Sequence, residues 1–442
     1  MILLNSSPIA WLNRPYFDLG PFNGGCRHVY GIELNYRNLI SDAPVAYKMQ
    51  VNHSPYFRES LLKETGMVQY RVNNPLQLAN ELRTERWNKL CDYLTHYQEL
   101  QPATKLRVMN LLRSLCLHQT VLEYVPEMSD SEVASDPALA ALAWCRAISN
   151  LILSYDYGKL NNLNEIEIIA TNAPSSSQVR FSAAIQLVVE YAKTFKDVAS
   201  AELWCSVATK EIQDLRPLLN DFDYKLLMSI YYRATSFVPL LHGDQEKVIQ
   251  EMDLCEFYGE SLTCENEEQQ ILANENRNIL TESRTKEALW LGELDLAEER
   301  SRRLVEWEPL DPRYRLELGE ILIKLGKIEE ATKEYGSATR LGPPGSEIAW
   351  FMMGQCYQAL GELEMACDCY LASLKIDPEA ISALEKLVNL APSLGNSALV
   401  NWSKRRLIEL QEQKQRMFAK PKRSYISEAS SELKTTAETM TI

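Results

Sequence analysis

Near the N-terminus, one cysteine and two histidines are the residues most able to do chemistry. Cys26, His28 and His53 could supply three metal ligands if two strands bring them together, because thiolate and imidazole are usual zinc ligands. Cys26 could also act as a nucleophile with a histidine as its base, although residues two apart on a strand face opposite sides. Since metal motifs show tighter paired spacing, we interpret them as a turn cysteine and two unrelated histidines.

Other reactive pairs are spaced poorly for a shared site. Cys367 and Cys369 lie two apart on a predicted helix, where they diverge by about 200° at 3.6 residues per turn, so we predict that they are packing residues. Cys116 and His118 diverge for the same reason. The glycines at 24–25 are followed by neither a lysine–serine pair nor a helix start, and no dinucleotide fingerprint occurs. We therefore expect no cofactor and no metal centre.

The densest aromatic and basic cluster in the helical part is Tyr231, Tyr232 and Arg233, with Phe237 and His242 downstream. Aromatic and arginine side chains are common anchors in protein interfaces, so this cluster could line a peptide groove. The alternative is a core helix whose arginine extends its charged end to solvent. We favour the core helix and keep the groove as a second hypothesis.

Helices must position most of these side chains. Leu78, Leu82, Trp87 and Leu90 recur at helical spacing, which predicts a helix that starts at Pro75. The same periodicity predicts further helices at 106–124, 137–155, 181–195, 199–215, 224–241 and 247–258. Paired helices of this length with short loops are typical of a helical domain.

Residues 1–72 have a different pattern. Apolar and polar residues alternate at 30–34, 45–51 and 68–72, which predicts a small antiparallel sheet. The expected fold class is mostly α, an α-α superhelix with a small strand-containing N-terminal cap. The expected parts are a strand-rich region at 1–72, a helical domain at 73–262, a repeat array with a capping helix at 281–410 and a disordered tail at 418–442.

The C-terminal half repeats itself at intervals of 34 and 35 residues. Three glycines, each followed five residues later by an alanine, mark bends between paired helices: Gly292 with Ala297, Gly326 with Ala331, and Gly361 with Ala366. Gly319 and Gly354 are predicted where two helices approach closely. Tyr335 and Tyr370 are predicted to fill the space between neighbouring units.

This spacing, together with Trp350, Gly354, Tyr357 and Pro378, resembles the tetratricopeptide repeat, a helix-turn-helix unit. The resemblance implies stacked helix pairs and a concave groove that holds a protein or peptide. Under that correspondence the groove residues are Arg313, Leu316, Glu320, Ile323, Lys324, Ile348, Phe351, Gln355 and Gln358.

Some members of this family hold a chaperone's terminal carboxylate through a lysine–asparagine clamp. Here Leu316 and Glu320 stand at the clamp positions of one unit, and Phe351 and Gln355 stand at those of the next. A helix or an extended apolar peptide therefore fits this groove better.

Composition narrows the partners and the compartment. A formal charge of −14 argues against nucleic acid as the main partner. No run approaches the length of a membrane-spanning apolar segment, and residues 1–5 lack the basic start of a signal peptide. The 10 cysteines lie scattered in helical patterns, which predicts reduced thiols and a cytoplasmic protein.

From these features we expect a non-enzymatic, protein- or peptide-binding adaptor or assembly module. A first alternative is an enzyme, or an accessory factor for maturation, in which residues 1–262 act on a peptide or protein that the repeats recruit. A second alternative is a peptide-sensing regulator. A homo-oligomer is also compatible with these features. The choice among these functions rests on fold analogy, and a fold does not determine a function.

Overall fold

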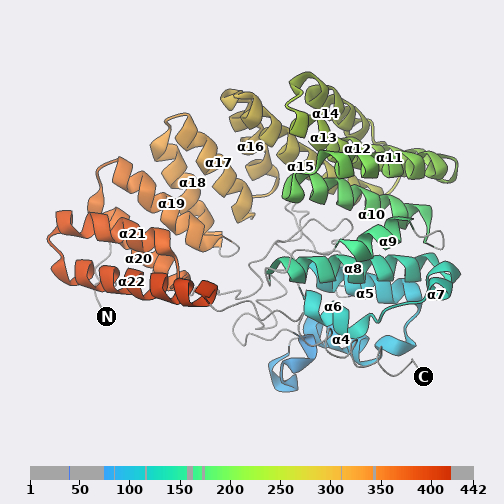
Figure 1. The fold of residues 1–442 in the computed structure, drawn as a ribbon, viewed down its shortest axis with the longest axis horizontal. Coiled ribbons are helices and arrows are strands. Elements are labelled where there is room, and N and C mark those ends of the chain that lie inside the picture. The colour runs from blue at the N-terminus through green and yellow to red at the C-terminus, as the bar shows by residue number, and fades with distance from the viewer. Residues whose placement is uncertain are drawn as a thin grey trace, which may run out of the picture. The chain divides into compact units, whose positions relative to one another are not determined.

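The computed structural model describes residues 39, 74–83, 85–114, 117–156, 163–171, 175–309, 311–341 and 345–419. Every regular element among them is a helix (Figure 1). The mostly helical fold class is therefore confirmed, whereas the strand-containing cap has no support in the described part of the chain. The strands predicted at 30–34, 45–51 and 68–72 lie outside these residues. No helix of the described part is long and apolar enough to cross a membrane.

Contacts between Cα atoms divide the chain into two compact units, with the boundary inside α19 (Ser346–Ala359), after Ala349. In the longer unit, the helices before the repeats are α4 (Glu85–Thr95), α5 (Pro102–Ser114), α6 (His118–Tyr124), α7 (Asp130–Ser135), α8 (Pro137–Asp156), α9 (Asn164–Thr171), α10 (Ser177–Glu190), α11 (Val198–Leu215), α12 (Asp221–Thr235), α13 (Phe237–His242) and α14 (Gln245–Glu260). They are followed by α15 (Glu267–Leu291), α16 (Leu294–Trp307), α17 (Pro312–Lys324) and α18 (Ile328–Leu341). The second unit continues with α20 (Leu363–Ile376), α21 (Ile381–Leu390) and α22 (Ser397–Ala419).

Within the longer unit, neighbouring helices pack as pairs: α10 on α11, α12 on α14, α15 on α16 and α17 on α18. In the second unit α21 packs on α20 and on α22. This is the arrangement of stacked helix pairs that the periodicity predicted.

The prediction that an α-helix starts at Pro75 is wrong. Pro75 instead opens a short 3-10 helix, η2 (Pro75–Gln77), and the α-helix begins only at Glu85. Asn74 closes this turn with a capping box, and the indole of buried Trp87 donates to the Pro75 carbonyl at 3.1 Å. These local hydrogen bonds satisfy backbone N–H and carbonyl groups at this turn, so a continuous α-helix is not needed there.

Pro239 divides the helix predicted at 224–241 into α12 and α13. A proline lacks the backbone N–H and its ring clashes with the carbonyl of the residue four positions earlier, which is Thr235, the last residue of α12. The Ser236 hydroxyl donates to the Arg233 carbonyl at 2.9 Å and so satisfies one carbonyl at the helix end. Phe237 and Leu240, which follow the break, line the candidate site described below.

The glycines predicted at the bends are confirmed. Gly292, Gly326 and Gly361 have φ of 80°, 74° and 83°, the left-handed region that glycine enters without a steric penalty. The alanines that follow them, Ala297, Ala331 and Ala366, are fully buried.

Gly319 and Gly354 lie at close helix contacts, as predicted, but the tyrosines have a different place. A Cβ added to Gly319 would lie 2.6 Å from the Tyr335 ring, and one added to Gly354 would lie 2.8 Å from the Tyr370 ring. Each tyrosine therefore fills the space inside its own helix pair, not the space between units.

We predict that Gly319→Ala lowers the free energy of unfolding by about 1–3 kcal/mol, because the buried Tyr335 ring cannot move aside. In a Tyr335→Ala background the same change should stabilise the protein by up to about 1 kcal/mol, since space is then open and alanine favours helix. Urea unfolding of the two single variants and the double variant measures this sign reversal. Gly326→Ala is the control, because its added Cβ meets nothing within 4 Å and its cost should not depend on Tyr335. Equal costs of Gly319→Ala in both backgrounds would contradict the contact.

A buried arginine holds α14, α15 and α16 together. Arg284 pairs with Glu287 at 2.8 Å on its own helix, and with Asp253 at 2.8 Å and Glu256 at 3.1 Å on α14. Its backbone carbonyl accepts a hydrogen bond from Arg300 of α16 at 2.7 Å. The Glu287 side chain is only 6% exposed, so its charge depends on these cations.

Arg284→Met should lower the free energy of unfolding by about 3–5 kcal/mol, because it leaves Glu287 buried with Arg300 as its nearest remaining cation. Adding Glu287→Leu should restore most of that loss. Arg303→Met removes an exposed pair with Glu299 and should cost less than about 1 kcal/mol. Chemical denaturation of the wild type and the three variants measures these free energies. If the double variant regains none of the lost stability, Arg284 is not needed to balance the charge of Glu287.

Candidate functional site

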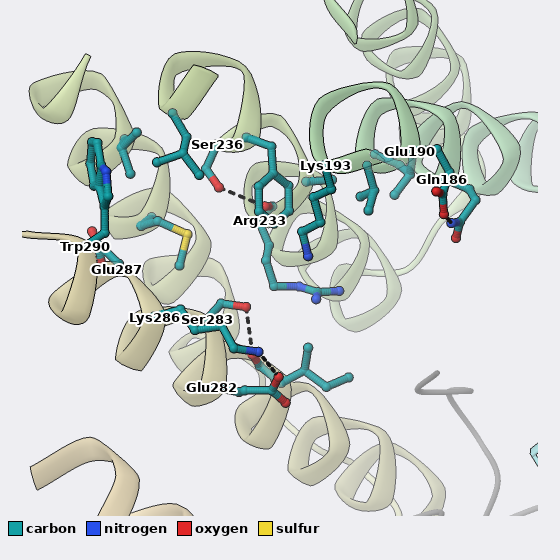
Figure 2. A pocket seen from close by; sticks show the side chains of 18 of the residues that line it. Gln186, Glu190, Lys193, Arg233, Ser236, Glu282, Ser283, Lys286, Glu287 and Trp290 are labelled. Atoms are coloured by element: carbon teal, nitrogen blue, oxygen red, sulfur yellow. Dashed lines mark hydrogen bonds and ion pairs between the residues drawn. The ribbon is translucent and has the colours of Figure 1, made fainter. Parts of the chain in front are cut away.

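A pocket of about 610 Å³ lies in the longer unit, between α10 on one side and α15 on the other (Figure 2). Residues on both sides of the break between α12 and α13 also line it, α14 contributes one turn and α17 contributes one residue. Its apolar lining comes from Ile185, Val189, Ala234, Phe237, Leu240, Val248, Met252, Ile279 and Trp290. Its charged lining comes from Glu190, Lys193, Arg233, Glu282, Lys286, Glu287 and Arg313.

The α10 wall widens into a π-helical turn, η5 (Tyr191–Phe195), at the level of the pocket. Such turns are rare and often occur at functional sites. Lys196 ends it in the left-handed region at φ 55°, and the Asp197 N–H donates back to the Tyr191 carbonyl at 3.0 Å. The turn places the Lys193 ammonium 4.2 Å from the centre of the Phe237 ring, in a cation–π contact.

The carboxylates of the pocket already have partners. Glu190 accepts from Gln186 at 2.6 Å and from Thr194 at 3.0 Å. Glu282 pairs with Lys286 one turn along α15. Glu287 is held by Arg284 outside the pocket.

The arginine contributed by α17 is also paired. Arg313 binds the fully buried carboxylate of Asp311 at 2.7 Å, next to the first turn of α17. Asp311 in turn accepts the Arg313 backbone N–H at 2.9 Å and so caps the helix. This pair fixes the α17 edge of the pocket.

Arg233 differs from the other cations. Among the described residues no carboxylate lies within ion-pair distance of its guanidinium, and its buried Nε has no hydrogen-bond partner. Figure 2 shows the side chains of Arg233 and Lys193 reaching into the same part of the cavity. A partly buried guanidinium without a counter-charge attracts an anion.

The two tyrosines beside Arg233 do not line the pocket. The Tyr231 hydroxyl shares a 2.7 Å hydrogen bond with Thr209, and Tyr232 stacks on Tyr258 with ring centroids 5.8 Å apart. Burial raises the pKa of both hydroxyls. Of the predicted cluster, Arg233 and the downstream Phe237 line the pocket, and the tyrosines pack in the core.

The groove residues predicted on α17 have mixed environments. Arg313 lines the pocket, whereas Glu320 and Lys324 are exposed and pair with each other at 2.8 Å. Leu316 and Ile323 are half-buried, and Leu316 packs against the backbone at Gly345. Ile348, at the start of α19, is 51% exposed.

The groove residues predicted on the second unit are half-buried and contact their own repeat. Phe351 lies against Tyr370 with ring centroids 5.7 Å apart, and Gln358 accepts the Tyr370 hydroxyl proton at 2.8 Å. Gln355 contacts the Met352 sulfur at 3.5 Å. Their role in binding stays a prediction.

The reactive side chains singled out from the sequence have no common site in the described residues. Cys26, His28 and His53 lie outside them. Cys367 and Cys369 are buried thiols in α20, and burial raises the pKa of Cys367 to about 11 and that of Cys369 further. In the part of the chain described here, no cluster of three or more potential metal-binding side chains occurs.

Glu317 of α17 lies in the charged region between α15 and α17, next to the pocket. Burial raises its pKa to about 7, the Lys286 charge opposes this, and Glu282 and Glu320 add to it. Because the folded-state pKa lies above the ordinary value of 4.5, the stabilisation from this carboxyl is full below pH 4.5 and is lost as pH rises through 7.

We predict that Glu317→Gln, which mimics the protonated carboxyl, stabilises the protein increasingly as pH rises. Relative to wild type, its free energy of unfolding should be nearly unchanged at pH 4.5 and higher by about 1–3 kcal/mol at pH 8, with solvent screening reducing the effect. Denaturation curves at several pH values measure the difference. Glu320→Gln, at an exposed position one turn away, should change by less than about 1 kcal/mol across the range. A difference independent of pH would exclude titration of Glu317.

Comparison with known proteins gives one family match. The model of the tetratricopeptide repeat matches residues 348–380, which comprise most of α19, all of α20 and the turn after it. No curated protein sequence matches the chain.

Solved structures with related helical arrangements include MamA, with 17% identity, a TM-score of 0.32, and coverage of 39% of this chain and 96% of that one. The APC/C hetero-tetramer Cut9-Hcn1 has 14% identity and a TM-score of 0.31, and the match covers 81% of this chain and 69% of that one. The TPR2AB domain of yeast Sti1, in a complex with pHSP90, has 14% identity and a TM-score of 0.23. That match covers 62% of this chain and 98% of the other. At these scores the likenesses carry no argument about function.

The family match agrees with the geometry of the helix pairs. It covers the unit in which Gly354 contacts Tyr370, Gly361 makes the bend and Ala366 is buried, and the same register recurs at Gly319, Gly326 and Ala331. Residues 348–380 of this chain therefore match the tetratricopeptide repeat, and the helix pair of α17 and α18 repeats the same register.

Proposed function

We propose that this protein is a non-enzymatic adaptor or assembly module that binds a peptide segment of a partner protein in the pocket between α10 and α15. A helical repeat fold of this kind indicates protein–protein interaction or a scaffold role. The observation that carries the finer proposal is the guanidinium of Arg233, which no described carboxylate balances, inside a cavity with a mixed apolar and charged lining. Ligand sites are usually concave and combine apolar side chains with polar groups that fix the orientation of the ligand.

The pocket suits a peptide segment better than a flat protein surface. It is concave, and its aromatic and arginine side chains, Phe237, Trp290 and Arg233, belong to the types that dominate binding energy at interfaces. Trp290 is 38% exposed, which leaves a large apolar ring at the rim for a partner side chain to cover.

The buried free thiols, including Cys255, Cys367 and Cys369, support a cytoplasmic setting as part of the proposal, since reducing compartments keep thiols free.

Filling the pocket should abolish binding without unfolding the protein. Ser283 lines the pocket, is half-buried and bonds only along its own helix, to the Ile279 carbonyl at 3.0 Å. In affinity capture from native extract, a partner retained by wild type should be lost with Ser283→Tyr, because the tyrosine ring occupies the cavity.

Ser206→Tyr is the matched control. Ser206 is exposed on α11 and makes the same kind of intrahelical bond, to the Glu202 carbonyl at 3.1 Å. This variant should retain the partner, and both variants should melt near wild type. Equal capture by wild type and Ser283→Tyr would show that the pocket is not the working surface. Capture of no protein at all would count against an adaptor.

A further inference from the structure

We propose that the pocket selects a peptide with a single carboxylate beside a large apolar side chain, and that Arg233 binds this carboxylate. This inference rests on the proposed function and names the chemistry of the ligand. Arg233 would be the residue that determines specificity, because the other charged groups of the pocket have contacts within the chain.

The charge of the lining favours one negative charge on the ligand. Four cationic side chains line the pocket, Lys193, Arg233, Lys286 and Arg313, and three carboxylates oppose them, Glu190, Glu282 and Glu287. The net lining charge is therefore one positive charge. Lys286 and Arg313 are paired with carboxylates, and Lys193 lies over the Phe237 ring. Arg233 is the cation whose charge no described carboxylate balances at ion-pair distance.

The same lining disfavours a phosphate group. A phosphate monoester carries nearly two negative charges at neutral pH, and its second charge would face three glutamates without a further net cation. A carboxylate matches the planar fork of a guanidinium with two parallel hydrogen bonds and one charge. Complementarity of charge thus selects a carboxylate over a phosphate.

The apolar walls determine what must flank the carboxylate. Ile185 and Val189 of α10 line one side, Ile279 of α15 lines the other, and the buried Met252 of α14 also lines the cavity. Burying an apolar side chain there would stabilise the complex in proportion to the area removed from water. Met252 adds a flexible thioether that adapts to different ligand shapes.

Of the positions implied by the family resemblance, Arg313 is the one that lines this pocket. Arg233 lies at the end of α12, before the first glycine bend at Gly292, and Leu316 and Glu320 do not line the pocket. The recognition we infer therefore depends on the break at Pro239 and not on the repeat register.

The experiment selects random peptides displayed on phage against three full-length proteins: wild type, Arg233→Glu and Ser283→Tyr. Peptides that bind wild type but not Ser283→Tyr are pocket ligands. We expect these to be enriched in aspartate or glutamate next to a large apolar residue. Arg233→Glu should instead enrich lysine or arginine at that position, a gain of binding that a misfolded variant cannot produce.

One enriched peptide, made with an amidated C-terminus, is then measured by fluorescence anisotropy. Replacing its acidic residue by the amide should weaken binding to wild type by about 10- to 100-fold and should have little effect on binding to Arg233→Gln. A phosphoserine at the same position should bind no more tightly than the acid. Octanoate, an apolar monocarboxylate, should compete only far above the peptide concentration.

The outcomes separate the two proposals. Pocket ligands without acidic enrichment, unchanged by Arg233→Glu, would overturn this inference and leave peptide binding in the pocket intact. Tighter binding of the phosphopeptide would replace the carboxylate by a phosphate, and displacement by octanoate at the peptide's own concentration would replace the peptide by a small molecule. If no selected peptide depends on an open pocket, the proposed function fails as well.

Discussion

The buried charge of Arg284 is the constraint on which the centre of the longer unit depends. A guanidinium removed from water needs carboxylates around it, and these come from α14 and from α15 itself. The Arg300 bond to the Arg284 carbonyl brings in α16. With three helices tied to one residue, the face of α15 that carries Glu282, Lys286 and Trp290 is held as one wall of the pocket. Glu287 pairs with Arg284 and also lines the pocket, so it links this network to the site.

Charge within the pocket has two separate uses. Most ionic groups are balanced inside the chain and act as structure, as the Asp311–Arg313 pair does at the start of α17. Glu317 illustrates the cost of crowding carboxylates nearby, since burial and its acidic neighbours raise its pKa to about 7. Arg233 is the exception, because no described carboxylate balances its charge, and the proposed preference for an anionic ligand rests on this difference.

The sequence predicted the repeat geometry well because each step has a local cause. A glycine at a left-handed bend, a buried alanine five residues later and a glycine under an aromatic ring are all readable from spacing. The predicted place of the Tyr335 and Tyr370 rings, between neighbouring units, was wrong. The position of Tyr335 within its own helix pair depends on a helix rotation that residue spacing does not determine. The helix from Pro75 also failed, because the Asn74 capping box competes with an ordinary helix start.

The pocket itself could not be predicted from the sequence in the same way. Its lining spans residues 185–313 and comes from seven helical elements, which only packing brings together. Lys193, Glu282 and Lys286 resemble ordinary surface residues of a helix in the sequence. The cluster at Tyr231 was a partial signal: it identified Arg233, but the tyrosines beside it point to the core. Pro239 was the signal that reasoning from periodicity missed, because it breaks an otherwise continuous apolar pattern.

These contacts indicate that the regular repeats and the irregular helices before Gly292 have different roles. Regular repeats need their aromatic and small residues for packing, as the contacts of Phe351 and Gln358 with Tyr370 show. A residue that satisfies its own repeat has fewer groups left for a ligand. The irregular helices before Gly292 are under no such periodic constraint and can leave a charge unbalanced at a helix break. On this argument the departures from the repeat pattern, a π-helical turn at Tyr191 and a proline break after Thr235, are where specificity can arise.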